Sequence, residues 1–345
     1  MSRLNTTRKA YTKEDFRKRA WQDHSFFCKE LFPTAFFVPF CKAHLEIFDL
    51  IFSAEPFVGV IAPRKLGKTP TICFSYPLKC ILYNTQTYIV IISETMDESR
   101  RHVMKITSAL ESNELIHYYY GHLVNRNVYE TQKESTQFAN KVWLRAKSFM
   151  SQIRGTGGDW SPPSLIIADD LQSNKDVKSE NTLQEAWNWF QDEVIFSRAQ
   201  KWQHPHFGYT GSGQIRFLGT SLHPLCVAEK VYADSRFKCL RYAILQDAEG
   251  RPDIVAGRSI WEEMFPTVEL YAEMKAAEHN GTLNNWLQER MNMPYKYGDR
   301  AFDITNMRFW NIGTNRFAVY QDEPVFFMED DMGLSIGALD LGGTT

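Results

Sequence analysis

The sequence Ala62-Pro63-Arg64-Lys65-Leu66-Gly67-Lys68-Thr69 directly follows the apolar run of residues 57–61 and is the most informative segment of the chain. It ends in Gly-Lys-Thr, as does the loop that binds the phosphates of a nucleotide between a strand and a helix. In such a loop the glycine lets the backbone wrap a phosphate, the lysine reaches the phosphate oxygens, and the hydroxyl holds Mg²⁺. Ala62 stands where the general motif has its first glycine, and Arg64 is an additional cation.

Strand-like and helix-like segments alternate on both sides of this loop. Pro70 begins a helix that reaches Leu82 and bends at Pro77, and further helical patterns cover residues 97–115 and 181–198. Alternation of this kind predicts an α/β fold with a doubly wound, mainly parallel sheet. The apolar runs expected to be its strands are residues 57–61, 88–92, 165–168, 215–218 and 240–245.

The composition restricts the class of protein. The chain has 345 residues, of which 43 % are hydrophobic, and a net charge of -2, so there is no global positive field that would indicate nucleic acid. The N-terminal segment up to Arg19 is locally basic. This basic arm can be a solvated helix face or a contact for nucleic acid or another partner, and both interpretations are open. No apolar run is long enough to span a bilayer, and the six cysteines lack metal-site spacing. We expect a cytoplasmic protein with no membrane partner.

A second acidic motif should accompany a phosphate loop, because phosphoryl transfer needs a Mg²⁺ ligand and a group that orients water. The apolar run of residues 165–168 ends in Asp169 and Asp170. Asp169 is then placed at the carboxyl end of a buried strand, where it can hold Mg²⁺, and Asp170 can polarise the attacking water. A carboxylate that only caps a helix is the alternative for Asp170.

Two further segments fit an ATP-hydrolysing enzyme. Arg154 precedes a glycine-rich turn and can project toward a phosphate of its own subunit or of a neighbour, although a surface arginine is an equal alternative. Thr220 follows the run of residues 215–218, where its hydroxyl can sense whether the γ-phosphate is present.

As a set, these motifs resemble the large terminase subunit of tailed bacteriophages, the motor that packs DNA into the procapsid. In that family the phosphate loop often lacks its first glycine and carries an arginine at the position of Arg64. Arg154-Gly155 matches the Arg-Gly that precedes the acidic strand, and Gly219-Thr220 matches the coupling motif. Residues 259–266 and 292–294 are similar to the helical lid subdomain.

The resemblance implies roles for individual residues. Arg64 acts in cis on the phosphates, and Arg154 is a candidate finger toward a neighbouring subunit. His44 stands where the family has its adenine-side group, and a core or capping histidine is the alternative. Asp340 is a first metal ligand of a nuclease domain, whose activity we expect only in a longer protein. The expected ATP-binding residues are Pro63, Arg64, Lys65, Leu66, Gly67, Lys68, Thr69, His44 and Thr220, and the expected metal ligands are Thr69, Asp169 and Asp340.

The resemblance also implies a division into domains and a set of partners. Residues 1–255 form the ATPase core, 256–330 a helical lid and linker, and 331–345 the start of an RNase H-like nuclease domain. The expected cofactors are ATP and Mg²⁺. Expected partners are double-stranded DNA, the small terminase subunit, the portal protein and further copies of the chain in a pentameric ring, all in the host cell cytoplasm.

Three points stay open at the level of sequence. Asp170 is one methylene shorter than the glutamate usual in the family, so another carboxylate, such as Glu180, is a candidate helper. A helicase-like remodelling ATPase shares the same core. A nucleotide-binding assembly module with negligible turnover is the alternative from a different class.

Overall fold

The computed structural model describes residues 11–124, 134–154, 161–177, 179–204, 208 and 210–294, together with the backbone of three short strands further on. The chain divides into two compact units, Met1–Tyr295 and Lys296–Thr345. In the second unit, β12 (Phe309–Asn311), β13 (Arg316–Ala318) and β14 (Val325–Phe326) form a small antiparallel sheet. Among the described helices, none combines the length and the apolar character that a membrane crossing requires.

The first unit is built on a seven-stranded sheet with the order β3-β4-β2-β5-β8-β1-β9. All neighbouring strands are parallel except β3, which pairs antiparallel with β4 at one edge. Central strands are buried along their whole length, because both faces of the sheet are covered. The strands are β1 (Phe57–Ile61), β2 (Tyr88–Ser93), β3 (Ser135–Gln137), β4 (Trp143–Ser148), β5 (Leu165–Asp169), β8 (Gln214–Gly219) and β9 (Lys238–Arg241).

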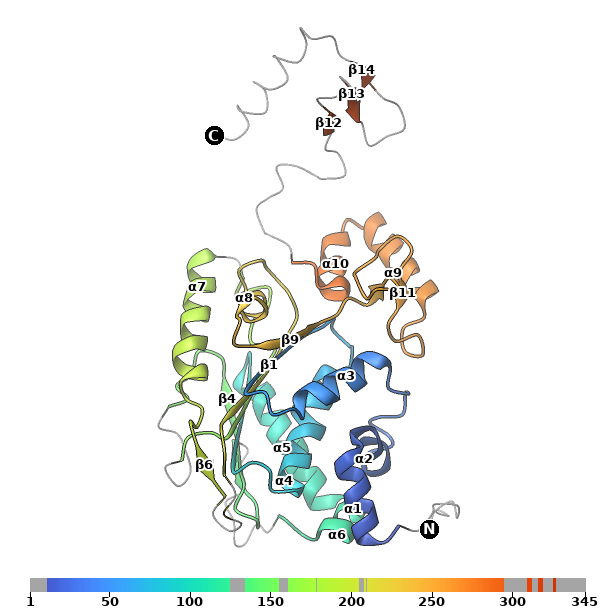
Figure 1. The fold of residues 1–345 in the computed structure, drawn as a ribbon. Coiled ribbons are helices and arrows are strands. Elements are labelled where there is room, and N and C mark those ends of the chain that lie inside the picture. The colour runs from blue at the N-terminus through green and yellow to red at the C-terminus, as the bar shows by residue number, and fades with distance from the viewer. Residues whose placement is uncertain are drawn as a thin grey trace. The chain divides into compact units, whose positions relative to one another are not determined.

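Helices cover both faces, and alternate residues of the central strands β1, β2, β5 and β8 enter two separate hydrophobic cores. Figure 1 shows α3, α4 and α5 on one side of the sheet and α7 and α8 on the other. The first face carries α1 (Lys13–Gln22), α2 (His24–Leu31), α3 (Lys42–Ile51), η1 (Pro70–Ser75), α4 (Tyr76–Leu82), α5 (Met96–Ser112) and α6 (Glu114–Tyr120). The second carries α7 (Glu180–Trp189), η3 (Phe190–Ile195) and α8 (Val227–Ala233). The predicted α/β fold with a doubly wound, mainly parallel sheet is therefore confirmed.

A small helical subdomain follows the sheet, as predicted. It contains the strand pair β10 (Leu245–Gln246) and β11 (Arg258–Ser259) and the helices α9 (Thr267–His279) and α10 (Leu283–Met291). The prediction of one strand over residues 240–245 was wrong. The backbone leaves the sheet after β9, because the amide of Ile244 donates to the carbonyl of Arg290 at the end of α10.

Three other predicted segments differ in detail. The helix predicted over residues 97–115 is interrupted at Asn113, whose side chain caps α6 by accepting from two backbone amides. The pattern over residues 181–198 forms α7 and then the π-helical turn η3. The tract 202–213, whose glycines, histidines and proline predict a loop, contains the short antiparallel pair β6 (Trp202–Gln203) and β7 (Thr210–Gly211).

The described part of the basic arm forms α1, which packs against α6. Arg17 donates through Nε to the carbonyl of Tyr119 at 2.5 Å, and Lys13 lies over the ring of Tyr118. The ring of Phe16 stacks on that of Tyr119 with centroids 3.6 Å apart. These cations therefore lie over aromatic rings of the same chain, an arrangement that favours the helix-face interpretation of this arm.

Candidate functional site

The loop from Ala62 to Thr69 connects β1 to η1 at the carboxyl edge of the sheet. Lys65 (φ 69°) and Gly67 (φ 78°) adopt left-handed backbone conformations, and a Cβ on Gly67 would stand 3.2 Å from Nε2 of His44. Ala62 continues the strand pairing by donating its amide to the carbonyl of Gly219, and its φ is not positive. A glycine is consequently unnecessary at position 62, which accounts for the departure from the general motif.

Lys68 is the most enclosed side chain of this loop that carries a charge, with 4 % of its surface exposed. Its Nζ donates to the carbonyl of Ala62 at 2.6 Å, to Oγ1 of Thr220 at 2.7 Å and to the carbonyl of Gly219 at 3.2 Å. It also lies 3.7 Å from Oδ1 of Asp170. The loop lysine, the residue after β8 and the acidic motif thus meet at one point.

Asp169 ends β5 and faces the loop. Its Oδ1 accepts from the hydroxyl of Thr69 at 3.3 Å, and its Oδ2 lies 3.4 Å from Nε2 of His102 on α5. A hydroxyl and a carboxylate, both oxygen donors, fit Mg²⁺, which proteins typically hold through one or two side chains while phosphates and waters complete the shell.

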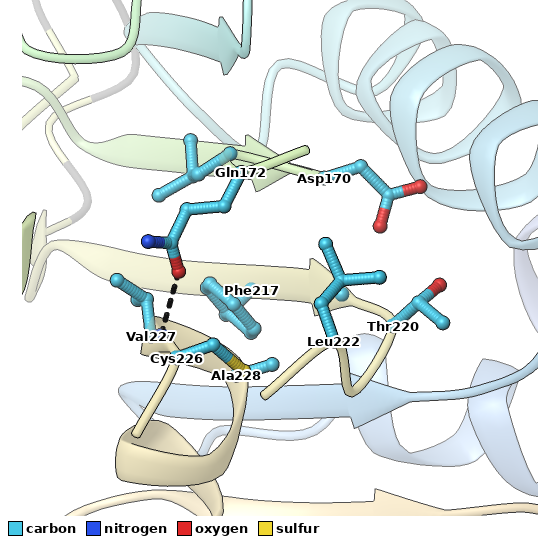
Figure 2. A pocket seen from close by; sticks show the side chains of 10 residues that line it. Asp170, Gln172, Phe217, Thr220, Leu222, Cys226, Val227 and Ala228 are labelled. Carbon is cyan, nitrogen blue, oxygen red and sulfur yellow. Dashed lines mark hydrogen bonds between the residues drawn. The ribbon is translucent and has the colours of Figure 1, made fainter. Parts of the chain in front are cut away.

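Asp170 follows directly and lies in a left-handed conformation with φ 39°. Figure 2 shows Asp170 and Thr220 at the ends of the neighbouring strands β5 and β8. Burial of the carboxyl raises the pKa of Asp170, and the positive charge of Lys68 opposes this shift. The predicted helper Glu180 is exposed at the start of α7 and does not line the cleft around Asp170.

That cleft has a volume of about 490 Å³ and lies on the solvent side of Asp170. Two carboxylates that the sequence analysis did not assign, Glu94 after β2 and Glu98 on α5, line it together with Arg64. Residues directly after buried parallel strands meet at the same edge of the sheet, so the position of Glu94 after the second strand is the signal that could have identified it.

Arg64 is directed toward the helical subdomain. Its Nε lies 2.9 Å from Oε2 of Glu289 on α10, and its backbone amide donates to the carbonyl of the same residue at 3.1 Å. Burial raises the pKa of Glu289, while Arg64 opposes this. No local pattern in the sequence marks Glu289, because it lies 225 positions after Arg64 and only the packing of α10 brings it there.

The segment after β8 is hydrogen-bonded to the end of α10. The amide of Ser221 donates to Oδ1 of Asn292 at 2.9 Å, and the Asn292 amide group donates to the carbonyl of Tyr242 at 2.8 Å. Nε2 of Gln288 donates to the carbonyl of Leu222. Thr220, which receives a hydrogen bond from Lys68, is therefore one residue away from a direct link to the helical subdomain.

His44 lies at the base of the loop, beside a second pocket. The amide of Cys41 donates to its Nδ1 at 3.1 Å, so Nε2 carries the proton and donates to the carbonyl of Leu66 at 2.8 Å. Burial lowers the pKa of His44, which favours this neutral form. Its ring meets that of Trp261 edge to face at 4.5 Å. His44 thus holds the loop backbone and also forms part of a pocket wall.

This pocket measures about 200 Å³ and is mostly apolar. Trp261 closes one side from the helical subdomain, and its indole nitrogen is fixed by a hydrogen bond to the carbonyl of Pro39 at 2.8 Å. Of the loop residues, Lys65 and Gly67 reach the pocket. The other lining residues are Ala35, Phe36, Phe37, Val38, Phe40, His44, Pro70, Thr71 and Met264.

One predicted residue is not brought to this site. Arg154 lies against η3, where its guanidinium donates to the carbonyl of Asp192 and its Nε lies 3.9 Å from Oε1 of Glu193. It lines neither the 490 Å³ cleft nor the 200 Å³ pocket. Asp340 falls outside the described residues.

Comparisons with known proteins give fold similarity alone. No family model matches the sequence, and no curated protein matches it either. The solved structure of the HK97 bacteriophage large terminase is 14 % identical, with a TM-score of 0.44, over 72 % of this chain and 49 % of that one. A large terminase from a thermophilic bacteriophage is 10 % identical, with a TM-score of 0.41, over 89 % and 75 % of the two chains.

A second structure of the thermophilic phage enzyme, in complex with ADP, is 14 % identical with a TM-score of 0.35, over 59 % of this chain and 46 % of that one. The chain therefore spans about half the length of the HK97 protein and of the ADP-bound thermophilic phage chain.

Proposed function

We propose that this chain binds ATP at the loop from Ala62 to Thr69 and hydrolyses it. The observation that carries the proposal is the position of Lys68, whose Nζ contacts Thr220 and lies beside Asp170 in an almost closed environment. Burial of an ammonium ion is costly unless the ion is paired and hydrogen-bonded, and phosphate oxygens can replace the present partners of Lys68. Pro63, Arg64, Lys65, Leu66, Gly67 and Thr69 complete the phosphate cradle.

Thr69 and Asp169 would hold Mg²⁺, which when bound neutralises charge on the β- and γ-phosphates. Asp170 would orient the attacking water and accept its proton. The water oxygen forms the new bond to the γ-phosphorus, the bond from phosphorus to the bridging oxygen breaks, and ADP and phosphate are released. Glu94 and Glu98 line the same cleft and are better placed than Glu180 to assist Asp170.

The 200 Å³ pocket would hold the adenine ring. Phe36, Phe40 and Trp261 supply apolar and aromatic surface, and Gly67 connects the pocket to the phosphate loop. His44 forms part of the wall and holds Leu66, so its expected role on the adenine side is to shape the pocket. Thr220 would sense the γ-phosphate through Lys68.

The biological role that we propose is a motor domain that translocates double-stranded viral DNA into a procapsid. Support comes from the motif set that resembles large terminase subunits, including Arg64 and Thr220. Further support comes from the hydrogen-bonded link between the segment after Thr220 and α10, which offers a route by which a change at the phosphates can move the helical subdomain. The proposed partners are the small terminase subunit, the portal protein and neighbouring copies in a pentameric ring, in the host cytoplasm.

Hydrolysis and nucleotide binding, measured together, test the enzymatic part. Lys68→Ala should abolish both, whereas Asp169→Ala should abolish hydrolysis and retain binding. Lys238→Ala, an exposed lysine paired with Glu55 on the edge strand β9, is the matched control and should keep both. If Lys68→Ala and Asp169→Ala both hydrolyse ATP at the parent rate, the proposal is wrong.

The DNA part has its own test. ATP-dependent movement of double-stranded DNA by the chain assembled with portal and procapsid, lost in Lys68→Ala, supports the packaging motor. Robust separation of the two DNA strands would favour the helicase-like alternative.

A second candidate function, a nucleotide-binding module with little turnover when the chain is alone, is favoured by a specific observation. Both arginines proposed to act on phosphates are engaged within the chain, Arg64 with Glu289 and Arg154 with Asp192 and Glu193. Specific activity that rises steeply with protein concentration would indicate that a neighbour supplies Arg154. Mixing Arg154→Ala with Lys68→Ala should then restore activity, since each protein provides the part that the other lacks.

A further inference from the structure

The carboxylate of Asp169 has two neighbours with metal-binding side chains that the proposed ATPase does not use. Cys73 comes from η1, on the helical segment after the loop, and His102 comes from α5. The Sγ of Cys73, a ring nitrogen of His102 and a carboxylate oxygen of Asp169 all lie within 4.8 Å of one another. Within the part of the chain that the structure describes, this is the one group of three such residues at this spacing.

Three separate elements hold these ligand atoms in place. Cys73 is fully buried in the hydrophobic core, and Asp169 is 5 % exposed at the end of β5. The side chain of His102 is 17 % exposed, so the group is open to solvent on the side of α5. An ion can therefore arrive from that side and meet a thiol and a carboxylate that are already fixed by the fold.

The donor set differs from the set proposed for Mg²⁺. Thiolate, imidazole and carboxylate together are the ligands of Zn²⁺ and similar borderline-soft ions, whereas Mg²⁺ takes oxygen ligands. With both Cys73 and Asp169 ionised, their two negative charges would balance a divalent cation. Three protein ligands leave one position of a tetrahedron for water, which is the pattern of an open zinc site.

We propose that Cys73, His102 and Asp169 form a binding site for a zinc-class divalent ion. Binding replaces the thiol proton of Cys73, which is released to solvent, and forms bonds from the ion to sulfur, nitrogen and oxygen. The ligand atoms must draw together, which moves the Asp169 carboxylate away from Thr69. If the proposed ATPase is correct, the occupied site inhibits hydrolysis by withdrawing Asp169 from Mg²⁺; the binding itself does not depend on that function.

The test uses Co²⁺ alone, added to the nucleotide-free protein, because cobalt substitutes for zinc and reports its ligands by absorption. We expect saturable binding of one ion, with visible bands of four-coordinate cobalt and a near-ultraviolet thiolate-to-cobalt charge-transfer band. Cys73→Ser should remove the charge-transfer band. His102→Gln should keep a thiolate ligand but weaken binding at least about tenfold.

Two cysteine controls separate this site from others. Cys80→Ser changes a buried thiol on α4 that is not part of the group, and Cys41→Ser changes a thiol that lies 3.0 Å from Nδ1 of His44 without a third ligand. Both should keep the cobalt spectrum. The absence of a thiolate band in the parent protein, or a band that survives Cys73→Ser, overturns the proposal.

Folding and function are controlled separately. Cys73→Ala is a second variant without the thiol, and each variant should keep the parent melting temperature within a few degrees when free of metal. Zn²⁺ should inhibit ATP hydrolysis of the parent in excess Mg²⁺ and lose at least about tenfold in potency in His102→Gln, relative to that variant's own rate. A parent protein that binds Co²⁺ as expected but has no ATPase activity leaves the metal site supported and refutes the proposed function.

Discussion

Three cationic side chains of lysine or arginine are buried in the described part of the chain, and they belong to two different regions. Arg216 and Lys79 lie within the body of the domain, whereas Lys68 lies at the carboxyl edge of the sheet. Arg216 donates to the carbonyls of Ile51, Ser53, Glu55 and Ile215. Neither it nor Lys79 forms an ion pair with a described residue.

Lys68 is held differently, because its acceptors have other donors. The carbonyl of Gly219 also accepts from the amide of Ala62, and the carbonyl of Ala62 also accepts from Thr220. The lysine can leave these acceptors without orphaning them, while Arg216 cannot. A buried cation such as Arg216, which is held by a fixed set of carbonyls, therefore indicates a structural role. A buried cation such as Lys68, whose partners can be replaced and which lies beside a carboxylate, indicates a ligand site.

The largest expected effect is on stability at Arg216. Arg216→Met should lower the free energy of unfolding by roughly 4 kcal/mol, because the buried carbonyl of Ile51 and the partly buried carbonyls of Ser53 and Glu55 lose a charged donor. Chemical denaturation measures the change. Arg236→Met, which removes an exposed arginine paired with Asp234, should stay within about 0.5 kcal/mol of the parent. Equal stability of the two variants would show that Arg216 has no special structural role.

The second prediction concerns Lys68, for which we expect a large loss of activity and little change in stability. Lys68→Met should reduce ATP hydrolysis by roughly 10²–10³-fold, since a preorganised cation at the phosphates is lost. Its unfolding free energy should remain within about 1 kcal/mol of the parent, because the acceptors keep other donors. Steady-state phosphate release and denaturation of the same protein provide both values. If the variant loses several kcal/mol of unfolding free energy, Lys68 has a structural role like that of Arg216.

The third prediction concerns pH and Lys79. Burial lowers the pKa of Lys79 from 10.5 to about 8, so the folded protein releases its proton before the unfolded chain does. Stability from this group should therefore rise as the pH increases from about 8 to 10.5, by up to about 3 kcal/mol. Subtracting the values for Lys79→Met at each pH isolates the effect. A difference that does not change over this range would contradict the assignment.

The smallest effect, a change in ATP affinity, is expected when Glu289 is substituted, because Glu289 pairs with the exposed loop residue Arg64. Glu289→Gln weakens the hold on Arg64 and should increase ATP affinity by up to about fivefold, the size of a half-exposed ion pair. Equilibrium binding of a fluorescent nucleotide measures it. Glu273→Gln, which removes the partner of Arg290 on the same helix, is the control and should leave the affinity unchanged.

Much of the fold was predictable because its signals are local. Four of the five expected central strands appear within a residue or two of their expected bounds. The errors occur where a distant partner decides the backbone. The strand expected over residues 240–245 ends early because Ile244 pairs with the end of α10. The edge strand β3 and its neighbour β4 have too few apolar residues to be recognised alone.

The candidate site divides in the same way. Lys68, Thr69, Asp169, Asp170 and Thr220 could be named from sequence, since each follows directly from a strand or belongs to the loop motif. Their proximity in the structure agrees with that interpretation, while their catalytic roles remain predictions. Trp261, Glu289 and His102 could not be named, because each sits in an ordinary amphipathic or turn pattern.

Local patterns in the sequence specify the turn from Ala62 to Thr69, the parallel sheet and the carboxyl edge at which the acidic motif lies, because strand length, turn chemistry and apolar runs are properties of neighbouring residues. The side chains that surround that edge depend instead on how distant segments pack. Arg64 is turned toward Glu289, Asp169 is placed between Thr69 and His102, and Trp261 closes the apolar pocket. Those contacts join residues far apart in the chain, and they arise only when α5 and the helical subdomain pack against the sheet.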